Sequence, residues 1–125
     1  MSPDRRAALD PWTLLLVAVG GAAGSLARTA LGAALAGQDA TVLAVNLTGS
    51  LALGLLIGLV GATRPRLSAL LGTGFLGGWT TFSAVSLIMV ADPLDHLLWL
   101  AFTLIGSVAL AWSGIRLGRL LRSRS

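Results

Sequence analysis

The sequence contains no cysteine, and only 11% of its 125 residues are Asp, Glu, Lys or Arg. The missing cysteine excludes a disulfide-stapled scaffold. Soluble domains contain about 25% charged residues, so this chain has too few to cover the large surface of a soluble domain of its size. Disordered chains are polar and charged, whereas 55% of this chain is hydrophobic and its mean hydropathy is +0.86. What remains is a small membrane protein with several spans.

Four nearly charge-free stretches are each long enough for a membrane-spanning helix, which needs about 20 apolar residues. They predict an all-α membrane protein with four transmembrane helices, at about 12–36, 41–62, 67–91 and 96–118, in a single domain over 1–125. The basic pair Arg5 and Arg6 before an apolar run also resembles a secretory signal peptide. Because that run does not stop at a cleavage site, we interpret it as a retained first helix.

The positions of the arginines predict the orientation. All nine basic residues are arginine, and eight of them fall on one side of the predicted topology. These eight are Arg5, Arg6, Arg64, Arg66, Arg116, Arg119, Arg122 and Arg124. The two opposite loops contain Asp39, Asp92 and Asp95 and no arginine. Cytoplasmic loops are enriched in Arg and Lys, so both termini are predicted to be cytoplasmic, in a multi-pass protein of the cell membrane. Contacts of these arginines with lipid phosphate or a partner would not change that orientation.

Every predicted span contains two glycines four residues apart. The pairs are Gly20 and Gly24, Gly54 and Gly58, Gly74 and Gly78, and Gly114 and Gly118. Glycine at this spacing lets helix backbones approach closely in lipid. The pattern predicts tight bundling, and the small volume that four short helices enclose favours an oligomer if the protein moves anything across the membrane.

Two polar residues lie inside the first two spans, where polar groups are costly and tend to be functional. Arg28 either attracts an anion or supports a polar cavity, or its side chain extends to the membrane surface. Asn46 either carries a function through its two N–H donors or holds two helices together.

The third span is unusually rich in glycine. Gly72, Gly74, Gly77 and Gly78 precede Thr80 and Thr81, a composition that disfavours a regular helix. We predict a break in this helix, since broken helices at membrane depth coordinate ions through backbone oxygens. The alternative is a glycine-rich packing face without a break.

Hydrogen-bond donors are present in the spans, and carboxylates are not. Thr103 and Ser107 share one face of the fourth span and form a polar track or bond to their own helix. No Asp, Glu or Lys lies inside a span, whereas proton-coupled transport usually needs a buried carboxylate. The amide, the hydroxyls and Arg28 suit an anion.

Several segments together resemble one known family over essentially the whole chain. They are residues 20–28, 41–50 and 74–83, with Ser107, Gly114 and Gly118 in the fourth span. The string GFLGGWTTFS at 74–83 is the most specific. These segments resemble the Fluc (CrcB) family of fluoride channels.

The resemblance implies an antiparallel dimer with two passive, selective fluoride pores that export fluoride from the cytoplasm. Carried over by position, Asn46, Thr81, Phe82, Ser83 and Ser107 would be pore residues, and Arg28 a structural or vestibule residue. A structural Na⁺ would be held at the dimer centre by the backbone carbonyls of Gly77 and Thr80. The expected partners are fluoride and membrane lipid, with no nucleic acid.

The chain departs from the family pattern at Val85, where the family usually has a second phenylalanine, and at Ile88, where it has a glutamate. An antiparallel homodimer also needs each chain to insert both ways, which the arginine bias opposes. We therefore hypothesise a fixed orientation and a heterodimer with a homologous chain inserted the other way. In that pair the partner would supply the intact phenylalanine pair.

Two other functions remain open from the sequence. A non-conducting or half-functional subunit of a heterodimeric channel fits the weakened position at Val85. A small multidrug exporter fits the four spans but relies on a buried glutamate in its first helix, and none exists here. An enzyme is not expected, because His96 is the only histidine and no nucleophile–base arrangement is visible.

Overall fold

The computed structural model describes residues 10–35, 37–61, 63–91, 93–94 and 96–124. Every regular element in those residues is helical. The elements are α2 (Pro11–Ala34), α3 (Gln38–Val60), α4 (Pro65–Leu67), the π-helical η1 (Ser68–Leu76), α5 (Gly77–Trp79), α6 (Ser83–Ala91) and α7 (Leu97–Arg122). Four stretches are long and apolar enough to cross a membrane, namely Pro11–Ala34, Gln38–Val60, Pro65–Ala91 and Leu97–Arg122. The four predicted spans are thus confirmed, and the fourth helix continues past its predicted end at 118 to Arg122.

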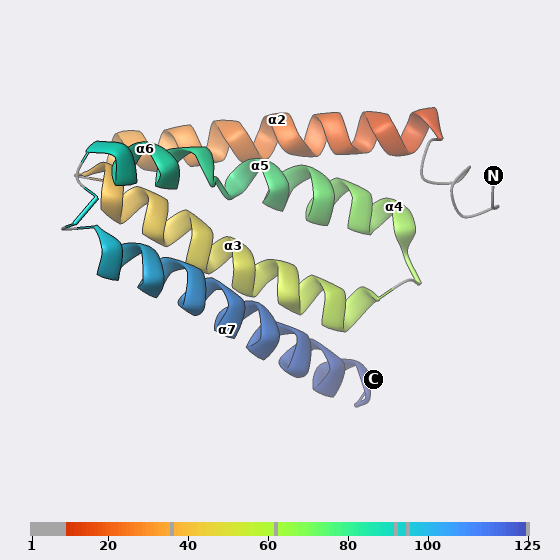
Figure 1. Cartoon of the computed structure of the whole chain (residues 1–125). Coiled ribbons are helices and arrows are strands. Elements are labelled where there is room, and N and C mark those ends of the chain that lie inside the picture. Colours follow the sequence, from red (N-terminus) through yellow and green to blue (C-terminus); the bar gives the residue numbers. More distant parts are fainter. Residues whose placement is uncertain (1–9, 36, 62, 92, 95, 125) are drawn as a thin grey trace, which may run out of the picture.

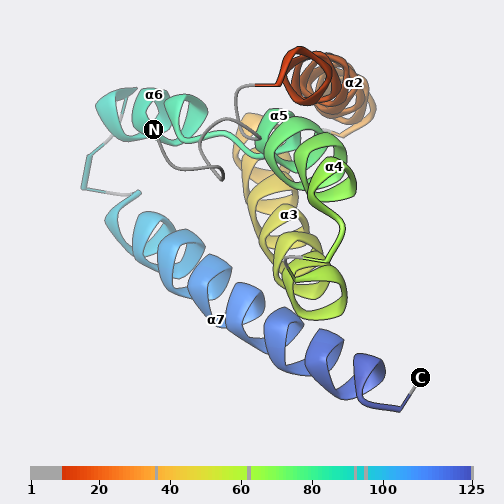
Figure 2. The same ribbon diagram turned by 90° about the vertical axis from the view of Figure 1, so that its right-hand side faces the viewer.

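The spans form two closely packed pairs of helices. In one pair α2 lies along η1 and α5, and in the other α3 lies along α7 (Figure 1). Seen from the end, α6 is displaced sideways from α5 (Figure 2). It packs against α3 and α7 through the buried side chains of Val85 and Ile88. The third span is therefore the irregular one.

Glycines allow the close approach within both pairs. A Cβ atom at Gly20 or Gly24 would overlap the backbone of Leu70 or Phe75, and one at Gly58 would lie 2.8 Å from the Cα of Gly118. A Cβ atom at Gly54 would overlap the carbonyl oxygen of Ala111. The predicted tight bundling is confirmed, because side chains at these glycines would push the helices apart.

Local sequence signals set the helix ends. Proline stands at the first position of both α2 and α4, where its fixed φ and missing N–H are tolerated. α3 ends at Gly61, whose φ of 53° favours glycine. At the other end of the bundle, Asp39 in the first turn of α3 pairs with His96 at the start of α7, at 3.0 Å between Oδ2 and Nε2.

The described arginines other than Arg28 gather at one end of the bundle, which also carries Asp10 at the start of α2. Arg64 and Arg66 begin the third span, and Arg119 and Arg122 end α7, at the end opposite Asp39 (Figure 1). Arg5, Arg6, Asp92 and Asp95, on which the predicted orientation also depends, lie outside the described residues. The described arginines other than Arg28 thus lie toward one end of the molecule.

Candidate functional site

The third span leaves the helical conformation after Trp79. Thr80 is extended, with φ −78° and ψ 156°, and the next helix, α6, begins at Ser83. The glycine-rich residues 72–78 that precede this point are helical, with the N–H of Gly77 donating to the carbonyl of Gly72. The non-helical residues are thus 80–82, directly after the glycines.

Asn46 of α3 binds the backbone at this point. Its Nδ2 donates to the carbonyl of Thr81 at 3.0 Å, and its Oδ1 accepts the Thr81 N–H at 2.8 Å. Both residues are buried, each 9% exposed. The carboxamide therefore satisfies both polar groups of a peptide that has left the helix, as buried backbone groups require. One N–H of Asn46 is left over, because a carboxamide has two.

The hydroxyl of Thr81 organises the start of α6. Thr81 Oγ1 accepts the N–H of Ala84 at 3.3 Å and lies 3.2 Å from Ser83 Oγ. A side-chain oxygen in this position satisfies one of the free N–H groups at a helix start. Thr81 thus connects α3, through Asn46, to the first turn of α6.

A cavity of about 230 Å³ lies beside Asn46. It is lined by Asn46, Gly49, Ser50, Leu53, Thr80, Thr81, Phe82, Val85, Thr103, Leu104 and Ser107. Four of the five predicted pore residues therefore line one space, and Ser83 does not line it. No carboxylate or basic group is among the lining residues. We call this space the Asn46 cavity.

The hydroxyls that line the Asn46 cavity differ in their bonding. Thr103 donates to the carbonyl of Trp99 in its own helix at 2.8 Å. Within the described residues, the hydroxyls of Ser50 and Ser107 have no hydrogen-bond partner in the protein. Two free donors therefore lie in the cavity. Sequence reasoning left out Ser50, although its spacing of four from Asn46 places both on one face of α3.

Phe82 and Val85 have opposite environments. Phe82 borders the cavity but is 70% exposed, whereas Val85 is 2% exposed and packs in a cluster with Val42 and Ile88. Only Phe82 offers an exposed surface to a neighbouring molecule. Val85 contributes an apolar wall.

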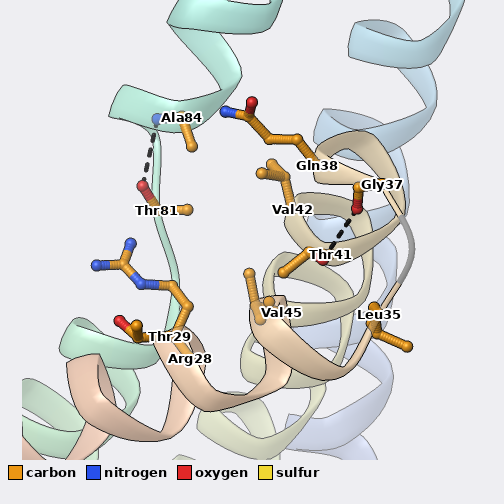
Figure 3. A pocket seen from close by; sticks show the side chains of 11 residues that line it. Arg28, Thr29, Leu35, Gly37, Gln38, Thr41, Val42, Val45, Thr81 and Ala84 are labelled. Atoms are coloured by element: carbon orange, nitrogen blue, oxygen red, sulfur yellow. Dashed lines mark hydrogen bonds between the residues drawn. The ribbon is translucent and has the colours of Figure 1, made fainter.

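A second cavity, of about 390 Å³, surrounds Arg28. In Figure 3 the Arg28 side chain extends from α2 toward the segment of Thr81 and Ala84, and Gln38 and Thr41 face the same space. No carboxylate in the described part of the chain pairs with Arg28. Thr81 lines both cavities. It therefore stands between the space around Arg28 and the space around Asn46.

Within the described part of the chain, the backbone carbonyls of Gly77 and Thr80 accept no hydrogen bond. Thr81, whose N–H would reach Gly77 in a continued helix, donates to Asn46 instead. In the described residues, no other N–H or hydroxyl bonds to either carbonyl. The helix interruption therefore leaves two oxygen ligands free.

The model of the family described as "CrcB-like protein, Camphor Resistance (CrcB)" matches residues 15–118. The chain belongs to the CrcB family. It is 37% identical over 111 residues to "Fluoride-specific ion channel FluC 2" of Rhodococcus jostii, covering 84% of this chain and 97% of that protein. It is 40% identical over 121 residues to "Fluoride-specific ion channel FluC" of Phenylobacterium zucineum, covering 89% and 95%.

A further CrcB relative, "Fluoride-specific ion channel FluC 2" of Bacillus subtilis, is 43% identical over 65 residues. That alignment spans 49% of this chain and half of the relative. Members of the CrcB family are ion channels and not enzymes. With four apolar helices, this CrcB chain is a multi-pass membrane protein.

Proposed function

We propose that the chain is a fluoride-selective channel of the cell membrane that passively exports fluoride from the cytoplasm. The observation that supports this most is the set of donors and the phenyl ring in the carboxylate-free Asn46 cavity. The names of the relatives specify fluoride for those proteins, and the donor set is consistent with it.

The chemistry of the Asn46 cavity suits a small, strongly hydrated anion. A pore must replace the lost water with donors, and the spare N–H of Asn46 and the free hydroxyls of Ser50 and Ser107 are available. The edge of the Phe82 ring carries partial positive charge and can face an anion. With no titratable carboxylate along the cavity, conduction would be passive and not coupled to protons.

The two cavities would be consecutive parts of one anion path. The unpaired guanidinium of Arg28 would raise the local concentration of anions in the wider cavity. From there an anion would pass Thr81, which lines both spaces. Thr81 would be a constriction whose backbone Asn46 holds in place, and Ser83 would act beside it through its contact with the Thr81 hydroxyl.

We propose that the free carbonyls of Gly77 and Thr80 would hold a structural Na⁺. Unwound carbonyls at membrane depth are typical ligands of Na⁺, and an unsatisfied carbonyl in lipid costs several kcal/mol. Two carbonyls do not complete the coordination of such an ion. A second chain would supply the remaining ligands, and the bound charge would raise the potential near the path.

We infer that the working unit is an antiparallel dimer. The 70% exposure of Phe82 at the rim of a cavity supports a partner that covers it. The arginine bias favours cytoplasmic termini and a heterodimer with a homologous chain inserted the other way. Two relatives carry the number 2 in their names. This numbering supports the idea that their organisms have a second homologous chain. The alternatives are a homodimer and a non-conducting subunit.

Fluoride efflux from liposomes, followed with a fluoride electrode, tests the function. Efflux by this chain alone indicates a homodimeric channel, and efflux only with a homologous partner indicates the heterodimer. Efflux with the partner that survives Asn46→Ala and Phe82→Ala in this chain would indicate the non-conducting role. No fluoride efflux in any combination, with chloride as the control ion, would contradict the proposal.

A further inference from the structure

An apolar groove runs along the exposed face of α7. It has a volume of about 500 Å³ and is lined by Leu104, Ile105, Val108, Ala109 and Trp112. Ile105 and Val108 are 70% and 71% exposed, and the spacing of three and four residues places the lining on one stripe of the helix. The groove adjoins the Asn46 cavity at Leu104, which lines both, and shares no lining residue with the cavity at Arg28.

A cation lies at one end of the stripe. The guanidinium of Arg116, one turn after Trp112, lies 4.3 Å from the centre of the Trp112 ring. Among the described residues, no carboxylate pairs with Arg116. A cation–π contact uses none of the N–H groups of a guanidinium, and these groups match the two oxygens of a phosphate. Arg116 therefore has N–H groups available for an anion.

The depth of Arg116 matches the border between hydrocarbon and headgroups. At about 1.5 Å per residue the charge-free part of α7, residues 97–115, is about 28 Å long, close to the hydrocarbon thickness of about 30 Å. Arg116 follows this stretch directly. Trp112 is then in the interfacial zone where tryptophan is enriched. Arg116 therefore lies at the border of the hydrocarbon, next to the headgroup region that contains the lipid phosphates.

The surroundings of Arg116 favour a net negative headgroup. Arg119 and Arg122 follow in the last turn of α7, and a guanidinium nitrogen of Arg122 lies 3.0 Å from the position of a Cβ on Gly61. That contact places Arg122 beside the end of α3, and Arg64 and Arg66 follow Gly61 by three and five residues in the sequence. Clusters of arginine at the membrane surface attract anionic lipids, whereas the cationic group of a zwitterionic headgroup is repelled.

We propose that α7 binds one anionic phospholipid, with its phosphate on Arg116 and an acyl chain in the groove from Trp112 to Leu104. The stripe changes from apolar to cationic at the hydrocarbon border. A phospholipid changes at the same border from an apolar acyl chain to an anionic phosphate. One phospholipid matches both parts of this stripe, with the acyl chain on the apolar lining and the phosphate on the guanidinium. A second copy of the chain is the alternative occupant, which the disulfide measurement below tests.

Native mass spectrometry of the full chain with added phosphatidylglycerol or phosphatidylcholine tests this site. We expect one retained phosphatidylglycerol per chain and about fivefold less retention in Arg116→Gln and Trp112→Leu. Arg124→Gln, the control, removes the same charge from an exposed position beyond α7 and leaves retention unchanged. Equal retention of both lipids, or equal effects of Arg116→Gln and Arg124→Gln, would overturn the proposal.

Two further measurements separate the other occupants. Inorganic phosphate in excess is expected not to displace the lipid, because the groove holds the acyl chain; displacement would show that only an anion site exists. In liposomes under oxidation, the Val108→Cys chain is expected to form no disulfide-linked dimer. A disulfide between two Val108→Cys chains would show that a second copy covers the groove. Unchanged gel-filtration profiles confirm that each variant is folded.

Discussion

The side chain of Asn46 replaces the backbone hydrogen-bond partners that Thr81 would have in a continuous helix. Its carboxamide accepts the Thr81 N–H at 2.8 Å and donates to the Thr81 carbonyl at 3.0 Å, across 35 residues of sequence. An amide side chain offers an acceptor and a donor side by side without carrying a charge. The same residue therefore keeps the interrupted helix in place and lines the cavity.

Replacing Asn46 affects both roles. Asn46→Ala leaves a buried N–H and a buried carbonyl unpaired, which costs about 2 kcal/mol or more. We expect a clear fall in the thermal unfolding temperature in detergent and loss of fluoride efflux. Asn46→Asp keeps the acceptor for the Thr81 N–H but buries a carboxylate against the Thr81 carbonyl. We therefore expect a loss of stability at least as large, and full loss of efflux because a carboxylate repels the anion.

The control for this pair is Ser113→Ala. Ser113 is exposed, and its hydroxyl donates to the carbonyl of Ala109 within its own helix α7, so we expect its removal to change the unfolding temperature little. If Asn46→Ala is as stable as Ser113→Ala, the two bonds to Thr81 do not hold the interrupted helix.

The contact between α3 and α7 at Gly54 has no room for a methyl group. A Cβ there would overlap the carbonyl oxygen of Ala111, and overpacking costs about 1–3 kcal/mol. Gly54→Ala should lower the unfolding temperature by about 5 °C or more. Gly32→Ala is the matched control, because its Cβ would lie 3.5 Å from a methyl of Thr41. Equal unfolding temperatures for the two variants would contradict the close packing.

Two hydroxyls four residues apart on α7 differ in what they can offer an anion. The Thr103 hydroxyl proton is used on the carbonyl of Trp99, whereas Ser107 has a free donor in the Asn46 cavity. A hydrogen bond to a charged group contributes about 1.5–3 kcal/mol, so Ser107→Ala should reduce fluoride efflux about tenfold. Thr103→Val should leave efflux nearly unchanged. The reverse order of effects in the electrode assay would contradict this assignment.

The four spans and the glycine packing follow from the sequence. Charge-free length predicts a span because each span must cross the same bilayer thickness, and α2, α3 and α7 agree with that reading. Glycine spacing predicts close approach but not the partner, since Gly54 could face any helix. The structure adds that α3 packs against α7 and that α2 packs against η1 and α5.

The site was less predictable, because it depends on contacts between distant segments. The glycines at 72–78 draw attention to the third span, but the chain is helical there and leaves the helix at Thr80. No local pattern links Asn46 to Thr81, since the partner is backbone and has no sequence signature. The burial of Val85 likewise depends on Val42 and Ile88, which lie on different helices.

The arginine distribution predicts a single orientation, and the cysteine-free sequence makes that measurable. Gln38 and Thr63 are exposed at opposite ends of α3. Single cysteines at the two positions should react with a membrane-impermeant maleimide from opposite sides of the cell membrane, Gln38→Cys from outside and Thr63→Cys only after the membrane is opened. The arginine bias is reduced when Arg64→Gln and Arg66→Gln are added to the Gln38→Cys chain. Part of these chains should then react only after the membrane is opened. Labelling of each cysteine from both sides in comparable amounts would show dual insertion, which an antiparallel homodimer needs and a heterodimer with an oppositely inserted partner does not.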